Sequence, residues 1–273
     1  MWNAGLLLLC LITVGAGSSG AEDVEKRLVS AVTCPDTESL HHVRVVNEFR
    51  DGTRATCGGT LINDRWVITA SKCYNGRDST LKVELGGHPR MAVKKQLRIA
   101  INDIRIYAKS KREEPIMMLK LPERVKNISP AKVQAGDCMA PSDGEELQVS
   151  GRGATTAEGG PGVKDLMCLE VKTLSKNHCP DLSGSRYKKY KYIYCGEGVD
   201  EAEIQACKGD SGSGLVKKEM TSKSHFFFWT KEVKVDVLYG VLISGHGDAC
   251  EDKFIFVDIC AKPIKKWIDK MLS

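Results

Sequence analysis

Short apolar runs, separated by Gly, Pro, Asn and Asp, recur along most of this chain. Examples are residues 65–70 (R-W-V-I-T-A), 116–121 (I-M-M-L-K-L), 147–150 and 239–244. Runs of this length between frequent turn residues are typical of strands in a β-barrel or β-sandwich. Residues 231–237 (K-E-V-K-V-D-V) alternate strictly between polar and apolar, which predicts a half-exposed strand. The pattern therefore predicts an all-β fold.

The last residues of the chain follow a different pattern. Ile264, Trp267, Ile268 and Met271 recur at helical spacing behind Pro263. Such spacing places apolar side chains on one face of a helix, and proline favours its first turn. We expect a closing amphipathic helix. The chain has no internal repeat or flexible linker, so we expect one compact unit.

The first residues resemble an export signal. Residues 5–14 are apolar and residues 15–21 are mostly small, although no Lys or Arg precedes the apolar run. This run is too short for a membrane span, so we expect residues 1–21 to be a cleaved signal peptide and the product to be secreted. Residues 22–27 (E-D-V-E-K-R) end in a dibasic pair and are predicted to be a short propeptide. Residues 28–273 would form the folded domain.

Composition and cysteine content agree with an exported globular protein. The 273 residues are 42% hydrophobic and 27% charged, and the net charge of +5 permits anionic partners without requiring them. Cys10 would leave with the signal peptide, and the even number that remains favours structural disulfides. The chain has no tight C-x-x-C pair of the kind that binds zinc, so neither a metal nor another cofactor is predicted. The remaining cysteines are Cys34, Cys57, Cys73, Cys138, Cys168, Cys179, Cys195, Cys207, Cys250 and Cys260.

Four segments, in order, resemble landmarks of the trypsin-like serine protease family. They are residues 28–34 (L-V-S-A-V-T-C), 57–74 (C-G-G-T-L-I-N-D-R-W-V-I-T-A-S-K-C-Y), 116–121, and 207–216 (C-K-G-D-S-G-S-G-L-V). The resemblance implies two packed antiparallel β-barrels and a C-terminal α-helix. The first barrel would take residues 28–135, and the second barrel with the helix residues 136–273. The family's disulfides would be Cys34–Cys168, Cys57–Cys73, Cys138–Cys260, Cys179–Cys195 and Cys207–Cys250.

The resemblance also identifies catalytic positions, and two of the three hold unsuitable residues. Ser211 stands at the nucleophile, with the backbone N–H groups of Gly209 and Ser211 as a remnant oxyanion hole. Lys72 replaces the histidine base, and Pro115 replaces the aspartate that orients it. Lysine has an ordinary pKa near 10.4 and proline has no carboxylate, so we predict that proton transfer from Ser211 fails. The alternative is a Ser211–Lys72 dyad, which needs a lysine pKa lowered by about three units through burial.

The family's specificity pocket is altered as well. Gln205 falls at its base, His246 at its rim and Phe254 on its wall, where the ring is expected to fill the slot. No histidine lies in a catalytic motif, so surface or structural roles are predicted for all six. They are His41, His42, His88, His178, His225 and His246.

The activation apparatus of the family is partly retained. Cleavage after Arg27 would free the amine of Leu28, which in the family inserts and pairs with the aspartate before the nucleophile, here Asp210. Ser30 and Ala31 replace the usual paired glycines, which would impede insertion. We expect cleavage after Arg27 still to change the conformation of the domain, although catalysis is lost.

Two surface features suggest binding. Residues 186–194 (R-Y-K-K-Y-K-Y-I-Y) interleave cations with tyrosines, which suggests anion binding through Arg186, Lys188, Lys189 and Lys191. The alternative is a solvated strand face whose tyrosines pack inward. A second basic stretch comprises Lys94, Lys95, Arg98, Arg105, Lys109, Lys111 and Arg112.

Two further motifs leave alternatives open. Residues 226–229 (F-F-F-W) lie in an expected long hairpin and would either form a partner site or pack into the second barrel. Asn127-Ile128-Ser129 is a glycosylation acceptor motif, followed by Pro130.

These observations predict a secreted, monomeric, non-catalytic protease homologue that binds a protein, a microbial surface or an anionic polysaccharide. Neither nucleic acid binding nor a membrane span is expected. The alternative function is an atypical serine endopeptidase that uses Ser211, with Lys72 as base.

Overall fold

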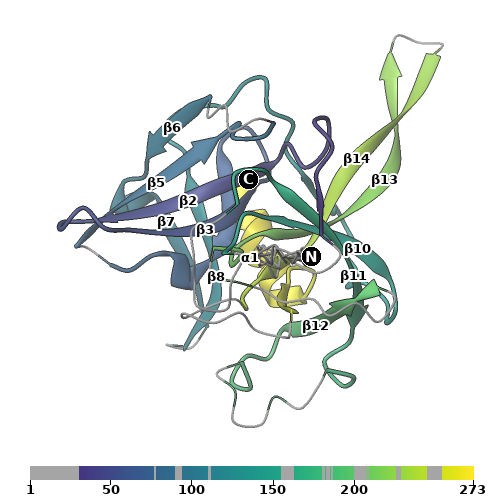
Figure 1. Ribbon diagram of the computed structural model, residues 1–273. Helices are drawn as coiled ribbons and strands as arrows, with labels where there is room; N and C mark the ends of the chain where they lie inside the picture. The colour runs from purple at the N-terminus through teal and green to yellow at the C-terminus, as the bar shows by residue number, and fades with distance from the viewer. Residues whose placement is uncertain are drawn as a thin grey trace, which may run out of the picture.

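The computed structural model describes residues 31–76, 78–89, 94–109, 112–154, 163–179, 182, 185, 187–199, 207, 209–225, 229–244 and 254–273. The predicted signal peptide and propeptide lie outside these residues. Within the described part, the chain forms two curled antiparallel sheets and one C-terminal α-helix (Figure 1). The predicted all-β, two-barrel fold is confirmed.

The first sheet has the strand order β6-β5-β2-β3-β4-β8-β7. Its strands come from one continuous part of the chain, and neighbouring strands are antiparallel. Their bounds are β2 (His42–Phe49), β3 (Arg54–Leu61), β4 (Trp66–Ala70), β5 (Ser79–Leu85), β6 (Lys95–Arg98), β7 (Ile104–Lys109) and β8 (Arg112–Lys120).

The second sheet has the order β1-β11-β10-β13-β14-β15-β12, and β9 pairs with β14. Its strands are β1 (Val32–Thr33), β9 (Lys132–Val133), β10 (Glu146–Gly151), β11 (Met167–Leu174), β12 (Ile193–Gly198), β13 (Gly214–His225), β14 (Trp229–Leu242) and β15 (Phe254–Asp258). Two of these strands, β1 and β9, come from the range predicted for the first barrel. The segments that flank the first sheet in sequence therefore tie it to the second.

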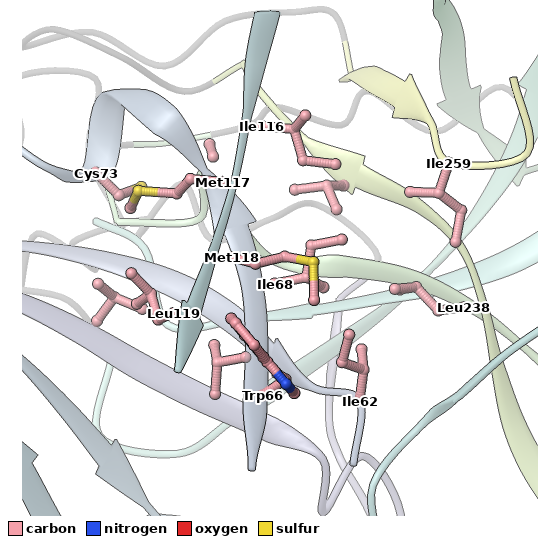
Figure 2. Close-up of a cluster of buried hydrophobic side chains, with 14 of the residues drawn as sticks. Ile62, Trp66, Ile68, Cys73, Ile116, Met117, Met118, Leu119, Leu238 and Ile259 are labelled. Atoms are coloured by element: carbon pink, nitrogen blue, oxygen red, sulfur yellow. The ribbon is translucent and has the colours of Figure 1, made fainter. Parts of the chain in front are cut away.

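One hydrophobic core joins the two sheets. Every residue of β4 is buried, because this apolar strand lies between β3 and β8 and faces the second sheet. Figure 2 shows Ile68 and Met118 from the first sheet beside Leu238 of β14 and Ile259, which follows β15. Each such side chain contributes about 1.5–3 kcal/mol when it is fully buried. The shared core fixes the position of the loops that end β4 and precede β13.

The closing helix forms as its apolar spacing predicts. Helix α1 (Lys262–Leu272) has a proline in its first turn and buries Ile264 and Ile268 completely. Trp267 contacts Tyr107 of the first sheet, with ring centroids 5.3 Å apart. The helix, which follows the last strand of the second sheet, thus packs against the first sheet.

Strands β13 and β14 form the predicted long hairpin. Their register runs from Gly214↔Val241 to His225↔Trp229, and the distal part projects from the body of the molecule (Figure 1). Phe226, Phe227 and Phe228 lie outside the described residues, so the binding or packing role of the aromatic run stays a prediction.

Four of the expected disulfides are present in the structure. They are Cys34–Cys168, Cys57–Cys73, Cys138–Cys260 and Cys179–Cys195. Cys207 is also disulfide-bonded, while its expected partner Cys250 lies outside the described residues. Such disulfide density is typical of extracellular proteins. None of the helices in the described ranges is both long enough and apolar enough to cross a bilayer.

Candidate active-site remnant

Lys72 lies where the first barrel meets the second. It belongs to a short 3-10 turn, Ser71–Cys73, directly after the buried strand β4, and the Cys57–Cys73 disulfide fixes that turn. The half-buried Lys72 side chain crosses to the second barrel, where Nζ donates to the carbonyl oxygens of Ile243 (2.7 Å) and Ser244 (3.3 Å). The amine is thus used as a hydrogen-bond donor to two backbone carbonyls.

Ser211 lies opposite, in the tight turn that precedes β13. The turn requires glycine after Ser211, since Gly212 has a φ of 91° and a Cβ there would lie 2.1 Å from Thr69 Oγ1. The Ser211 side chain is buried, and its hydroxyl donates to the Ser244 carbonyl oxygen at 2.6 Å. The backbone carbonyl of Ser211 accepts from the N–H of Gly58, which connects this turn to β3.

The same Ser244 carbonyl oxygen therefore accepts from both Ser211 and Lys72. An amide carbonyl accepts a hydrogen bond, but it is too weak a base to take the proton of an attacking hydroxyl. An ammonium group has three donors and no acceptor. In this arrangement the Ser211 hydroxyl donates its proton to a backbone carbonyl oxygen, whereas the hydroxyl of an activated serine donates to the lone pair of a neutral base.

Pro115, predicted to stand at the position of the orienting aspartate, lies buried in β8. Pairing between β7 and β8 is irregular here: Ile106 faces Met117, whereas Ala108 faces Glu113. Proline has no N–H for the ladder, which accounts for an interruption at this point. The neighbouring carboxylate, Glu114, is itself buried.

Asp210 is a buried carboxylate in a close-fitting backbone cradle. Its oxygens accept from the N–H groups of Gly153 (2.7 Å) and Cys207 (3.1 Å). A Cβ on Gly153 would lie 2.3 Å from Asp210 Oδ2, so the approach requires glycine there. Burial raises the pKa of Asp210 to about 6, against the opposing effect of the two backbone donors. Arg27 and Leu28, its expected activation partners, lie outside the described residues.

Phe254 fills space at the expected pocket wall. It is 2% exposed and stacks on Phe256, which in turn stacks on Tyr194. The cavity beside Phe254 and Asp210 measures about 10 Å³, which is room for about one water molecule. Gln205 and His246, the other predicted pocket residues, lie outside the described residues.

The basic and aromatic segment exposes its lysines and buries its tyrosines wholly or in part. Tyr187 and Tyr194 are buried, while Lys188, Lys189 and Lys191 are exposed. Lys189 Nζ lies 5.0 Å from the Tyr190 ring centroid, and Lys191 Nζ lies 5.8 Å from that of Tyr192. Tyr187 and Tyr194 thus pack inward, and the three lysines form a row of exposed residues; Arg186 lies outside the described residues.

A buried histidine cluster has no counterpart among the motifs of the sequence. It consists of His41, His42 and His88, each less than 8% exposed, beside Arg44 and Arg152. His41 Nδ1 lies 3.0 Å from Asp236 Oδ2, and His88 Nε2 lies 2.9 Å from the Pro35 carbonyl oxygen. His42 Nε2 is buried without a hydrogen-bond partner. The only sequence signal was the adjacent His41-His42 pair at the start of an apolar strand.

Outside this cluster, the described histidines lie apart from Ser211 in the fold. His178 is exposed on the surface and pairs with Asp143, and His225 ends β13 at the far end of the hairpin. Among the residues that the structure describes, no group of three or more His, Cys, Asp or Glu has a metal-binding arrangement.

The double barrel, with a serine turn and a buried aspartate at the junction, defines a serine-protease-like architecture. The family model described as Trypsin matches residues 31–268, and the chain belongs to that family. It is similar to Serine protease 1 of Rattus norvegicus, with 29% identity over 223 residues that cover 77% of this chain and 82% of the relative. It is also similar to Trypsin-4 of Rattus norvegicus, with 31% identity over 208 residues and 74% and 80% coverage.

Solved structures share the fold. The structure of GrC superposes with a TM-score of 0.66 at 20% identity and covers 89% of this chain and 98% of that one. Neuropsin, a serine protease from mouse brain, superposes with a TM-score of 0.64 at 22% identity, with 89% and 99% coverage.

Proposed function

We propose that this chain is a secreted, non-catalytic member of the trypsin family that acts by binding. The observation that carries the proposal is the donation of both the Ser211 hydroxyl and the Lys72 amine to the Ser244 carbonyl oxygen. A serine nucleophile needs a base for its proton and a third group that orients the base. Lys72 and Pro115 supply neither in this arrangement, and the Phe254 ring occupies the wall of the expected substrate slot.

The proposal includes secretion and proteolytic processing of the chain. Removal of residues 1–21 as a signal peptide and of residues 22–27 as a propeptide would leave a domain beginning at Leu28. Support comes from the apolar N-terminal run and from the four disulfides, which are favoured in oxidising compartments. Its two barrels would divide near residue 135.

Restoration of the two missing groups is the direct test of lost catalysis. The domain beginning at Leu28 is treated with a small fluorophosphonate probe, which phosphonylates an activated serine with loss of fluoride and does not need a filled specificity pocket. We expect no labelling of the native protein at pH 7.5. We expect the double variant Lys72→His, Pro115→Asp to be labelled at Ser211, because it regains a base and an orienting carboxylate at the same positions.

Two controls define the outcome. Adding Ser211→Ala to the double variant should remove all labelling, which assigns the label to Ser211. Labelling of the native protein that disappears in Lys72→Arg would establish the serine–lysine dyad and overturn the non-catalytic proposal, because arginine keeps the charge but cannot act as a base.

We propose the exposed lysine row, Lys188, Lys189 and Lys191, as the binding surface for an anionic polysaccharide. Support comes from the exposure of all three lysines within four residues and from the contacts of Lys189 with Tyr190 and of Lys191 with Tyr192. Adjacent cations attract sulfated chains by an interaction that salt screens. Arg186 would extend the row.

We expect the native protein to be retained on heparin and to elute only at raised salt. Changing Lys188, Lys189 and Lys191 to Glu should bring elution down to the salt concentration of an inert protein. The matched control changes three exposed lysines outside this segment, Lys126, Lys164 and Lys262, to Glu, with the same change in net charge. Equal losses in both variants would show that only net charge matters and would remove the assigned surface.

A further inference from the structure

The connection between β8 and β9 is held to the first barrel by two backbone hydrogen bonds, six residues apart. The N–H of Val125 donates to the Asp64 carbonyl oxygen (2.7 Å), and that of Ala131 donates to the Leu61 carbonyl oxygen (2.9 Å). Val125 and Ala131 are buried, and Ile128 between them packs against the main core. The loop is therefore an ordered part of the barrel surface.

The inward position of Ile128 directs its neighbours outward. Asn127 and Ser129 are both exposed, on either side of the anchored Ile128. Asn127 has a φ of 62°, in the left-handed region that asparagine enters more readily than most residues. Pro130 is exposed as well and does not cover the asparagine. The one acceptor motif of the chain thus presents its amide and its hydroxyl to solvent.

We infer that Asn127 is an N-glycosylation site that carries an oligosaccharide in the exported protein; this inference rests on the proposed secretion. In the transfer, the amide nitrogen of Asn127 forms a bond to the anomeric carbon of a lipid-pyrophosphate-linked oligosaccharide. The bond from that carbon to the pyrophosphate oxygen breaks, the lipid pyrophosphate leaves, and the amide loses one proton. No oxidant or reductant takes part. The folded loop leaves room for the product because the attachment atom is on the surface.

The position of the site keeps the glycan away from the serine turn. The loop is anchored at Leu61 and Asp64, at the turn that begins β4, whereas Lys72 follows the other end of that strand. Strand β4 (Trp66–Ala70) spans about 13 Å in its four extended steps, and Lys72 follows its far end in the 3-10 turn. A glycan on Asn127 would therefore be attached at the opposite end of β4 from Lys72.

The test expresses the full chain through a eukaryotic secretory pathway and determines the mass of the secreted product before and after digestion with a peptide glycosidase. We expect a single discrete mass loss and an aspartate left at position 127. Asn127→Asp, which tolerates the same backbone conformation, and Ser129→Ala should each abolish the modified fraction. Pro130→Ala should raise it, because proline after the motif hinders transfer. Asn102→Asp, an exposed asparagine without the motif, should leave it unchanged.

Failure of this inference is distinguishable from failure of the proposed secretion. A secreted product that has lost residues 1–21 but carries an unmodified Asn127 would overturn the glycosylation site. A cell-retained chain that keeps residues 1–21 would overturn secretion instead. A second variant with a proven export signal in place of residues 1–21 then decides the site, since an unmodified Asn127 in that product would also refute it.

Discussion

Cleavage of the Arg27–Leu28 bond is expected to raise the free energy of unfolding at pH 7.5 by about 3 kcal/mol, and Asp210→Asn is expected to abolish that gain. Asp210 is 4% exposed, and burial raises its pKa from 3.8 to about 6. At 1.36 kcal/mol per pKa unit, the buried anion costs about 3 kcal/mol at neutral pH. A free Leu28 amine that inserts beside Asp210 supplies the opposite charge and removes this cost.

The sign of the pH dependence follows from the raised pKa. In the uncleaved chain the folded state binds a proton on Asp210 up to about pH 6, whereas the unfolded state releases it near 3.8. The contribution of Asp210 to stability is therefore fully present below pH 3.8 and is lost as the pH rises through 6. In Asp210→Asn this slope is absent, so the difference between the two uncleaved proteins changes by about 2.5 kcal/mol between pH 4 and pH 7.5.

Urea unfolding of four proteins measures both effects: the cleaved and uncleaved forms of the native chain and of Asp210→Asn. An Arg27→Gln variant, exposed to the same protease, controls for cleavage elsewhere. An equal gain on cleavage in both backgrounds would show that the new terminus stabilises the fold without pairing with Asp210. The finding of an intact Arg27–Leu28 bond in the secreted protein would end the proposed switch.

The fold was predictable from sequence because it depends on short motifs and local periodicity. The burial of Ile264 and Ile268 by the C-terminal helix follows from their spacing alone. The assignment of Lys72 and Pro115 to the replaced catalytic positions rests on the segments beside them and stays a prediction. The Ser244 carbonyl oxygen was not predictable as the common acceptor of Lys72 and Ser211, because a backbone oxygen has no sequence signature. Its role depends on how β14 ends beside the turn of Ser211.

Other features depend on contacts between distant segments, which periodicity does not report. The pairing of β1 and β9 with the second sheet is one such case, since both strands come from the range assigned to the first barrel. The histidine cluster is another, because His42, His88 and Arg152 are far apart in sequence and belong to no motif. Burial of charge-bearing groups is the property that sequence patterns describe least well.

Acidification below pH 6.5 is expected to destabilise the native chain through His42, and His42→Gln should remove that part of the loss. Burial lowers the pKa of His42 well below 6.5, and the positive charges of Arg152 and Arg44, with His41 and His88, lower it further. The acidic groups of the cluster are already engaged, since Glu84 pairs with Arg44 and Asp236 with His41. A proton on His42 would thus meet the half-buried cations Arg44 and Arg152, while the carboxylates of these residues are already paired.

Because the pKa of His42 is lowered and that of Asp210 is raised, the two groups change the free energy of unfolding in opposite directions as the pH falls. The unfolded state takes up a proton near pH 6.5 and the folded state does so only at lower pH, so stability is present above 6.5 and is lost as the pH falls below it. The expected loss is about 1.4 kcal/mol per pH unit over that window. Urea unfolding at half-unit steps from pH 7.5 to 5 measures it, and the informative quantity is the difference between the native chain and His42→Gln.

His178→Gln is the matched control, because that histidine is exposed on the surface and pairs with Asp143. It should leave the acid dependence of unfolding nearly unchanged. A difference between the native chain and His42→Gln that does not vary with pH would show that the cluster is simply packed and does not respond to protons.

The two buried groups oppose each other in the uncleaved chain. As the pH falls from 7 toward 5, protonation of Asp210 adds stability while protonation at the His42 cluster removes it, so the net slope of the uncleaved protein should be shallow. After cleavage at Arg27, Asp210 would stay an anion paired with the Leu28 amine. Its protonation would then no longer add stability as the pH falls from 7 toward 5. The cleaved protein should therefore lose stability more steeply on acidification than the uncleaved one, and His42→Gln should restore a shallow slope to it.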